Sequence, residues 1–395
     1  MDLSDVRVVD LTRLLPGPYA TQLLADLGAE VVKIEDTGAG DMARYTEPVV
    51  DGVGGLFASV NRGKRSVSLD LKSEGGRDAF HAVARDADAV VEGFRPGVAS
   101  RLGVDYDSVR EHNPDVVYVS LTGYGQEGEC SDAVGHDLNY VGHAGLLDMT
   151  RACGAGDGRA GDEDGGRDAG SGEGEPVIPG YPVADMSGGL TAAFAVVSGL
   201  LSRELGDGGG YVDVSMTDVV TSMGQAVVSH AAGGGSPRPG ETELTGGLAC
   251  YGVYECADGD YVTLAALEPK FWRAFCEAVD RDDLASRHME AGDELRREIA
   301  AIFEGRAADD WLEFFDVSEV PVGPVKSPGE ALDDARERGL VRGELLDSVG
   351  APFVADVPGA DDDVPTRGEH TAEVLVDAGY SESEVEALRE RGDVA

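Results

Sequence analysis

The chain has 395 residues, of which 42% are hydrophobic, and it carries 32 Lys and Arg residues against 75 Asp and Glu residues, a formal net charge of −43. An acidic excess of this size repels nucleic acid and anionic membrane, so we expect no nucleic-acid partner. The apolar fraction is ordinary for a globular protein of two domains. Because the acids are spread along the whole chain, they predict a folded protein with a surface adapted to high salt, which screens self-repulsion.

The cysteines and the start of the chain bear on its location. The five cysteines are Cys130, Cys153, Cys250, Cys256 and Cys276, and no CxxC pair occurs. An odd number without metal-ligand spacing favours reduced thiols in a cytoplasm and predicts no metal site. MDLSDVRVVD is not a signal peptide, and no apolar stretch approaches the ~20 residues that span a bilayer. We therefore expect a cytoplasmic protein with no membrane partner.

The first 125 residues alternate between two kinds of segment. Short β-branched runs predict strands, and apolar residues at helical spacing predict helices between them. The expected strands are 6–11, 30–35, 65–71, 88–94 and 115–121, and the expected helices are 16–28, 75–87 and 97–113. This alternation predicts an α/β fold, a Rossmann-like large domain whose parallel sheet is covered on both faces. Functional residues in such folds gather beyond the carboxyl ends of the strands.

The rest of the chain divides by composition. Residues 152–175 are rich in glycine and acids and predict a mobile insert. An apolar stripe of Leu190, Phe194, Val197 and Leu201 predicts a helix over 186–205, and YVDVSM (211–216) predicts a strand followed by a helix. We expect the large domain to span 1–205 and to be completed by a helical chain end, 340–395. A linker over 206–247 would then lead to a smaller α+β domain, 248–330, with a hairpin turning at Asp258-Gly259 and helices over 269–279 and 307–317.

Two motifs bear on nucleotide or phosphate binding. GYGQEG (123–128) matches GxGxxG after a strand, but no helix start follows and Glu127 would repel phosphate, so it is a poor dinucleotide site. NRGKRS (61–66) is a basic cluster in a chain with five lysines, and Lys33, Arg95 and Arg101 add cations in the same domain. Such a cluster indicates either a phosphate-bearing ligand or arginines paired with the abundant acids.

Three acid/base residues are candidate catalytic groups. Asp185, just before an apolar helix, favours an N-cap on local physics, and the same place also suits a catalytic carboxylate at a helix N-terminus. Ser187-Gly188-Gly189 after it would let a ligand approach the backbone. His136, in VGHDLNY, fits an exposed loop histidine or a base oriented by Asp137. Glu268, in ALEPKFW, fits a first-turn acid of the following helix.

At this point the sequence resembles a known family along nearly its whole length. DLTRLLPGPYATQLLADLGAEVVKIED, NRGKRSVSLDLKSEGG, VVEGFRPGVASRLGVDY, PDVVYVSLTGYGQEG and GEHTAEVLVDAGYSESEV are similar to the family III CoA-transferase superfamily of CaiB/BaiF type, which includes α-methylacyl-CoA racemases. The resemblance implies an interlocked homodimer of large and small domains. It also implies an acyl-CoA thioester substrate and no metal or redox cofactor, CoA being part of the substrate.

The resemblance also assigns catalytic roles. Asp185 in VADMSGG matches an aspartate that transferases use as a nucleophile and racemases as one of two acid/base groups. His136 in GHDLNY matches the other racemase group, and Glu268 in ALEPKF matches a small-domain glutamate that, from the partner subunit, would hold His136 in its working tautomer. Transferases usually lack that histidine, so the match favours a racemase of 2-methylacyl-CoA thioesters acting through an enolate, with a CoA-transferase using a covalent Asp185 anhydride as the alternative. N–H groups at the start of the helix after Asp185 would bind the enolate oxygen.

The resemblance places CoA along one strand and one loop. The expected contacts are Ser68, Leu69, Asp70, Leu71, Arg95, Gly135, Asp137 and Tyr140. A family arginine that meets CoA phosphate falls at Asp36 here, so Lys33 or Arg44 is expected to replace it. The acyl group and the pathway are not predicted.

Overall fold

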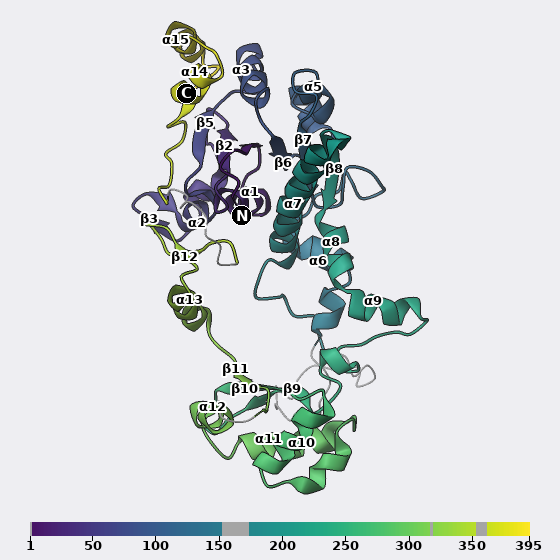
Figure 1. Cartoon of the computed structure of the whole chain (residues 1–395). Coiled ribbons are helices and arrows are strands. Elements are labelled where there is room, and N and C mark those ends of the chain that lie inside the picture. Colours follow the sequence, from purple (N-terminus) through teal and green to yellow (C-terminus); the bar gives the residue numbers. More distant parts are fainter. Residues whose placement is uncertain (1, 152–173, 317–318, 353–361) are drawn as a thin grey trace, which may run out of the picture. The chain divides into compact units, whose positions relative to one another are not determined.

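The structure is a computed structural model that describes residues 2–151, 174–316, 319–352 and 362–395. The chain forms two compact units (Figure 1). The large unit comprises residues 1–144, 180–223 and 332–395, and the small unit comprises 145–179 and 224–331. Most of the acidic insert expected at 152–175, with Cys153, lies outside the described residues.

A six-stranded parallel sheet forms the centre of the large unit, in the order β5-β2-β1-β6-β7-β8. From β1 the chain runs outward through β2 to β5, and from β6 it runs the opposite way to β8. The order reverses between β1 and β6, which makes this the topological switch point of the sheet. The predicted α/β fold is confirmed. The strands are β1 (Arg7–Asp10), β2 (Glu30–Glu35), β5 (Arg65–Ser68), β6 (Ala89–Glu92), β7 (Val117–Thr122) and β8 (Gly210–Ser215).

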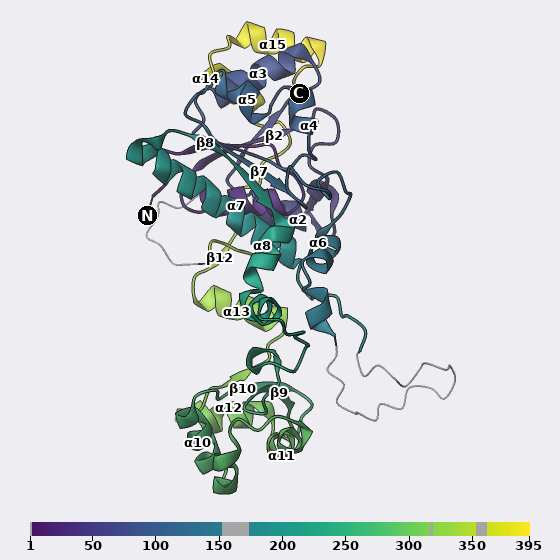
Figure 2. The same ribbon diagram turned by 90° about the vertical axis from the view of Figure 1, so that its right-hand side faces the viewer.

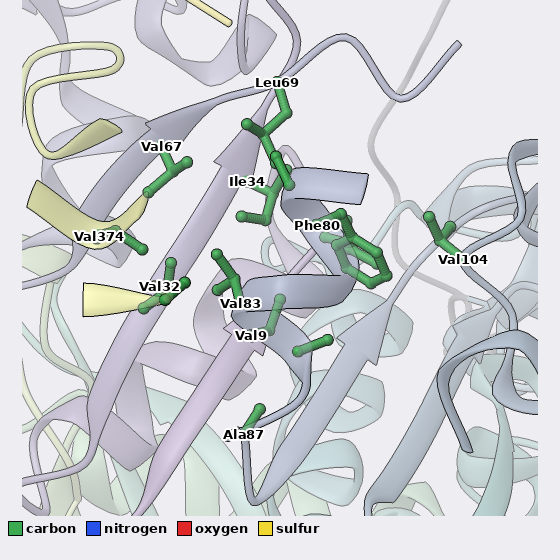
Figure 3. Packing of buried hydrophobic residues seen from close by; sticks show 14 of the residues in the cluster. Val9, Val32, Ile34, Val67, Leu69, Phe80, Val83, Ala87, Val104 and Val374 are labelled. Carbon is green, nitrogen blue, oxygen red and sulfur yellow. The ribbon is translucent and has the colours of Figure 1, made fainter. Parts of the chain in front are cut away.

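One face of the sheet packs against α3 (Glu74–Ala84), α14 (Thr371–Asp377) and α15 (Glu382–Arg391). Figure 3 shows Phe80 and Val83 of α3 over the strand residues Val9 and Val32. Each fully buried side chain of this kind stabilises the fold by about 1.5–3 kcal/mol. The apolar residues whose spacing predicted a helix over 75–87 thus form the buried face of α3.

The opposite face is covered by α1 (Pro16–Ala25) and α7 (Val183–Ser202). Two glycines of α7 allow this packing. A Cβ at Gly189 would lie 2.4 Å from the Pro16 carbonyl oxygen, and one at Gly199 would lie 2.5 Å from Val117 Cγ1. Gly188 likewise faces Met216, so Gly188 and Gly189 are used for helix packing and not for the ligand approach that the sequence suggested.

The chain end completes the large unit beside β5 (Figure 1), and Figure 2 shows α14 and α15 next to α3. Thr371 Oγ1 accepts a hydrogen bond from the Ser68 N–H at 3.0 Å. The Asp70 N–H donates to the Asp393 carbonyl at 2.8 Å, and Leu69 forms a β-bridge with Val394. The free edge of β5 is therefore closed by residues more than 300 positions away in the sequence.

Two helices differ from their predicted bounds. The helix expected over 97–113 is two short helices, α4 (Val98–Leu102) and α5 (Tyr106–Arg110), because Gly103 adopts a left-handed conformation (φ 67°) that ends α4. α7 begins at Val183, three residues earlier than expected. The strand predicted over 211–216 and the helix after it are confirmed as β8 and α8 (Met216–Met223). Because β8 is an edge strand of the large sheet, the first part of the range expected as a linker belongs to the large unit.

The apolar stripe that predicted α7 faces away from the sheet. Leu190, Phe194 and Leu201 are 51%, 70% and 60% exposed. With the turn that follows it, α7 is long and apolar enough to cross a membrane by length and composition alone, so the expectation of no such stretch was wrong. Its opposite side packs on α1 and β7 as the core helix of the large unit.

The small unit has its own core. β9 (Tyr251–Glu255) and β10 (Tyr261–Ala265) form the predicted antiparallel hairpin, and β11 (Val322–Pro324) pairs with β10. Three helices, α10 (Pro269–Ala278), α11 (Asp293–Phe303) and α12 (Ala308–Asp316), cover it with a cluster of buried aromatic side chains.

The remaining elements of the whole chain are η1 (Met42–Tyr45), β3 (Val49–Val50), β4 (Val53–Gly54), α2 (Gly55–Asn61), α6 (Asp137–His143), η2 (Leu147–Thr150), η3 (Arg203–Asp207), α9 (Gln225–Ala232), η4 (Glu243–Thr245), η5 (Asp282–Arg287), α13 (Pro328–Glu337), β12 (Val341–Arg342) and β13 (Ser348–Val349).

Candidate active site

The predicted catalytic residues of the large unit lie beyond the carboxyl ends of its strands. α6, which begins after His136, follows the loop leaving β7. α7 ends before β8, a strand parallel to β7, so the beginning of α7 also lies at the carboxyl edge of the sheet. This edge is where ligands bind in open α/β sheets.

Asp185 is the third residue of α7 and not its N-cap, which is Pro182. The side chain that caps the helix is Asp137, 48 positions earlier. Its Oδ1 atom accepts hydrogen bonds from the N–H groups of Ala184, at 2.6 Å, and of Asp185, at 3.1 Å. The Asp185 carboxyl is thereby free of a capping role, which favours the catalytic interpretation over the N-cap.

The environment of Asp185 favours its neutral form. Burial raises the pKa of the Asp185 carboxyl to about 6, and the nearby Asp137 carboxylate adds to this rise, whereas His136 acts in the opposite direction. A carboxyl group that titrates this close to neutrality can either accept or deliver a proton in a working enzyme.

His136 is the N-cap of α6, and its side chain is exposed. Its backbone N–H donates to Asn139 Oδ1 at 3.1 Å, which fixes the turn. Asp137 bonds to α7, so the expected role of Asp137 in orienting the imidazole is not what its carboxylate does here. The electrostatic effect of His136 on Asp185 places the two groups in one neighbourhood. Neither side chain is sealed from solvent.

Tyr140 braces the loop that carries His136. Its hydroxyl donates to the Gly135 carbonyl at 2.6 Å, and its ring fills the space beside Gly123, where a Cβ would come within 2.2 Å of Tyr140 Cε1. Burial and the Asp185 carboxylate raise the pKa of the Tyr140 hydroxyl to about 12, and Arg95 acts against this rise. Of the predicted CoA contacts, Asp137 thus bonds to the Asp185 backbone, Tyr140 lies near Asp185, and Gly135 and Arg95 lie near Tyr140.

The N–H groups expected to bind an enolate oxygen are occupied. Those of Ala184 and Asp185 donate to Asp137, and that of Met186 donates to the Pro182 carbonyl. The start of α7 therefore offers no free donor at these three positions. The expectation was wrong because the cap comes from a distant loop.

A cavity of about 500 Å³ opens at the switch point, between the loops after β1, β2, β5 and β6. Of the predicted CoA segment, Leu69, Asp70 and Leu71 line it. Ser68 is fully buried behind it, with its N–H bonded to Thr371 and its C=O to the Ala395 N–H. Arg13, which the sequence analysis did not single out, also lines the cavity, together with Lys72 and Phe94. The feature of the sequence that could have identified Arg13 is its position shortly after the first predicted strand.

The cations expected to replace the missing family arginine are not available to a ligand. Lys33 is fully buried and pairs with Asp41 at 3.0 Å, and Arg44 is buried against Glu35. The NRGKRS cluster is used in the same way. Arg62 pairs with Asp26, Lys64 with Asp10 at 3.2 Å, and Arg65 with Glu30. Of the two interpretations of this cluster, pairing with acids is confirmed.

Glu268 lies in the small unit, at the N-cap position of α10. Its carboxylate makes no capping hydrogen bond and is exposed. Glu268 thus stands where an acid at the start of a helix was predicted, but its side chain does not cap α10. Among the described residues, no three His, Cys, Asp or Glu side chains are grouped to hold a metal ion.

Comparison with known proteins identifies the family. The model of CoA-transferase family III matches residues 3–371. Succinyl-CoA:mesaconate CoA-transferase of Haloarcula hispanica is 34% identical over 95% of this chain and 96% of that protein. Alpha-methylacyl-CoA racemase of Mus musculus is 32% identical over 98% and 95%. A crystal structure of a CAIB/BAIF family protein from Brucella suis has a TM-score of 0.77 and 27% identity, and covers 95% of this chain and 99% of that one. The chain thus belongs to CoA-transferase family III.

Proposed function

We propose that the protein is a racemase of 2-methylacyl-CoA thioesters in which His136 and Asp185 are the two acid/base groups. The observation that carries the proposal is that the exposed His136 imidazole acts electrostatically on the Asp185 carboxyl, whose pKa is raised to about 6. The 32% identity to the Mus musculus racemase supports it.

The reaction needs a base and an acid on opposite sides of one carbon. One group removes the proton next to the thioester carbonyl, and the electron pair of the broken C–H bond moves into an enolate. The other group delivers a proton to the opposite face, so atoms and charge balance over the cycle. Because either enantiomer can react, each group must serve in both roles, and a carboxyl near neutrality suits this requirement.

A homodimer belongs to the same proposal. The exposed stripe of Leu190, Phe194 and Leu201 on α7 is an apolar surface that a second copy of the chain would cover. Glu268 of that copy would hold the His136 imidazole in its working tautomer. What supports this role is that the Glu268 carboxylate is exposed and makes no capping bond in its own chain.

A CoA-transferase is the second candidate. The 34% identity to the Haloarcula hispanica transferase favours it. In this reaction an Asp185 oxygen would attack the thioester carbonyl, CoA thiolate would leave, and a mixed anhydride would form. A partly buried carboxyl beside solvent is compatible with such a nucleophile.

One experiment separates the two candidates. A single enantiomer of a 2-methylacyl-CoA is incubated with the protein in deuterated water, with and without a free carboxylic acid. The racemase incorporates deuterium at the α carbon and loses chirality, and the His136→Ala variant loses both. Transfer of CoA to the free acid with an adduct on Asp185, undiminished in His136→Ala, would overturn the racemase proposal in favour of the transferase.

A further inference from the structure

The loop between β1 and α1 is held by charged side chains that are buried beneath it. Asp10 accepts a hydrogen bond from the Thr12 N–H at 2.8 Å. Lys33 Nζ donates to the Thr12 carbonyl at 2.9 Å, and the Leu14 N–H donates to Asp41 Oδ1 at 3.0 Å. Every one of these three charged groups is at most 2% exposed. The backbone on both sides of Arg13 is therefore fixed.

The buried charges form a closed set that needs no ligand. Lys33 lies 3.0 Å from Asp41 and 4.0 Å from Asp10. Asp10 also pairs with Lys64, whose ammonium is surrounded by Thr21, Asn61 and the Pro18 carbonyl. Buried charges persist only when they are paired and hydrogen-bonded, and these meet both conditions. Their visible effect is on the loop, where Leu14 is held at a φ of 67°, a value that residues other than glycine rarely adopt.

Arg13 is the charged residue that the loop between β1 and α1 exposes to the cavity. Its side chain is exposed and lines the 500 Å³ cavity. Within the described part of the chain, neither Arg13 nor the Lys72 ammonium of the same cavity has an ion-pair partner, whereas Lys33 and Arg44 are consumed in the core. In a chain of net charge −43, two unpaired cations in one cavity mark it for an anion.

The cavity also carries acids that must be weighed. Glu35 is paired with Arg44 and Asp41 with Lys33. Asp36 and Asp70 accept backbone hydrogen bonds, from Gly38 and Lys72. They lie after the ends of β2 and β5, where carboxylates commonly accept hydrogen bonds from ribose hydroxyl groups. They suit the polar part of a nucleotide and leave the anion to Arg13 and Lys72.

We propose that Arg13 binds an oxyanion of the acyl-CoA substrate and that the buried Lys33–Asp41 pair positions it. The inference rests on the proposed acyl-CoA function and adds to it a residue that contacts the substrate. The oxyanion is either a phosphate of CoA or a carboxylate on the acyl group, and the guanidinium fork matches both.

Calorimetric titration with CoA, propionyl-CoA and succinyl-CoA tests the assignment. Arg13→Gln is compared with the wild type and with Arg338→Gln, which removes another exposed arginine of the large unit. If the anion is a phosphate, Arg13→Gln raises the Kd of all three ligands by about tenfold, and Arg13→Lys restores part of the loss. If the anion is the acyl carboxylate, Arg13→Gln leaves the Kd of CoA unchanged and abolishes a preference for succinyl-CoA over propionyl-CoA.

Unchanged Kd values for all three ligands in Arg13→Gln would overturn the role of Arg13 and leave the proposed function standing. A wild-type protein that binds none of them would instead overturn the proposed function.

The positioning role is tested by a double-mutant cycle. If Asp41 acts through Arg13, Asp41→Asn weakens binding in the wild-type background and has no further effect in Arg13→Gln, because coupled sites are not additive. The same fold loss in both backgrounds would mean that Asp41 serves the fold alone. Thermal melts establish that each variant is folded. Arg13→Gln changes only an exposed side chain, so its result stands even if Asp41→Asn does not fold.

Discussion

The Asp137 carboxylate accepts a hydrogen bond from the Asp185 N–H, so one acid of the site caps the helix that carries the other. Asp137 thereby fixes the start of α7 and raises the pKa of Asp185 through its charge. The two effects separate on substitution, because an asparagine keeps the acceptor oxygen and loses the charge.

Asp137→Asn is expected to shift the acid limb of the pH profile of kcat/KM, near pH 6, to lower pH. Loss of the neighbouring charge lets Asp185 ionise more easily, while the amide oxygen still caps α7. Asp137→Ala should show the same shift and in addition lose about 1 kcal/mol of unfolding free energy with the cap. Asp132→Asn, an exposed acid of the same loop, is the control. An acid limb at the same pH in Asp137→Asn and Asp132→Asn would contradict the assignment to Asp185.

Glu92 should make the large unit less stable as the pH rises. Burial raises the pKa of this carboxyl to about 7, from an ordinary value of 4.5. The folded protein therefore holds a proton that the unfolded chain releases between these values, and stability present below pH 4.5 is lost as the pH rises through 7. Glu92→Gln should gain up to about 3 kcal/mol relative to the wild type at pH 8 and little at pH 4.5.

Thermal melts at both pH values check this, with the exposed Glu111→Gln as the control. The amide oxygen of the glutamine can still accept the hydrogen bond from Phe94, which Glu92 now accepts at 2.6 Å. A gain of equal size at both pH values would show that ionisation of Glu92 is not the cause.

Gly189→Ala should destabilise the protein although alanine favours helices. The added Cβ would lie 2.4 Å from the Pro16 carbonyl oxygen, a backbone atom that cannot rotate away. We expect a loss of about 1–3 kcal/mol of unfolding free energy. Gly180→Ala is the control, because a Cβ there meets nothing within 4 Å. Denaturant unfolding curves measure both, and equal midpoints for the two variants would contradict the packing argument.

We expect Phe194→Glu to shift the protein from dimer toward monomer and so to lower its molecular mass in solution. The Phe194 side chain is 70% exposed on the apolar stripe of α7, and a charge there would be buried by a second copy. Light scattering after size exclusion should show a dimer for the wild type and a shift toward monomer for the variant. Val376→Glu, on an exposed position of α14, should remain dimeric. A wild-type monomer, or a variant dimer of unchanged stability, would count against this face as the interface.

Much of the large unit could be predicted from local sequence. Its strands are short β-branched runs, and α3 shows its buried face in the spacing of Phe80 and Val83. The motif around His136 and the helix after Asp185 drew attention to two residues that the structure brings into one neighbourhood. Local pattern was sufficient here because each feature depends on neighbours within a few positions.

The errors came from long-range partners. Lys33 looked like a phosphate ligand because its charge is rare in this chain, but its ammonium is neutralised by Asp41 inside the fold. Asp185 looked like a cap because nothing local shows that Asp137 would take that position. The stripe on α7 predicted a helix correctly, yet apolar spacing does not tell which surface will cover it.

The closure of β5 and of the two residues after it by His370, Thr371 and residues 393–395 has a consequence for how the protein is made. During synthesis the strands of the first 125 residues emerge long before the segment that seals their edge, and residues 224–331 can condense into their own core in the meantime. An unsealed edge strand is a template for pairing with another chain. Ribosome-bound or truncated chains lacking residues 362–395 should therefore depend on chaperones more than the finished protein does.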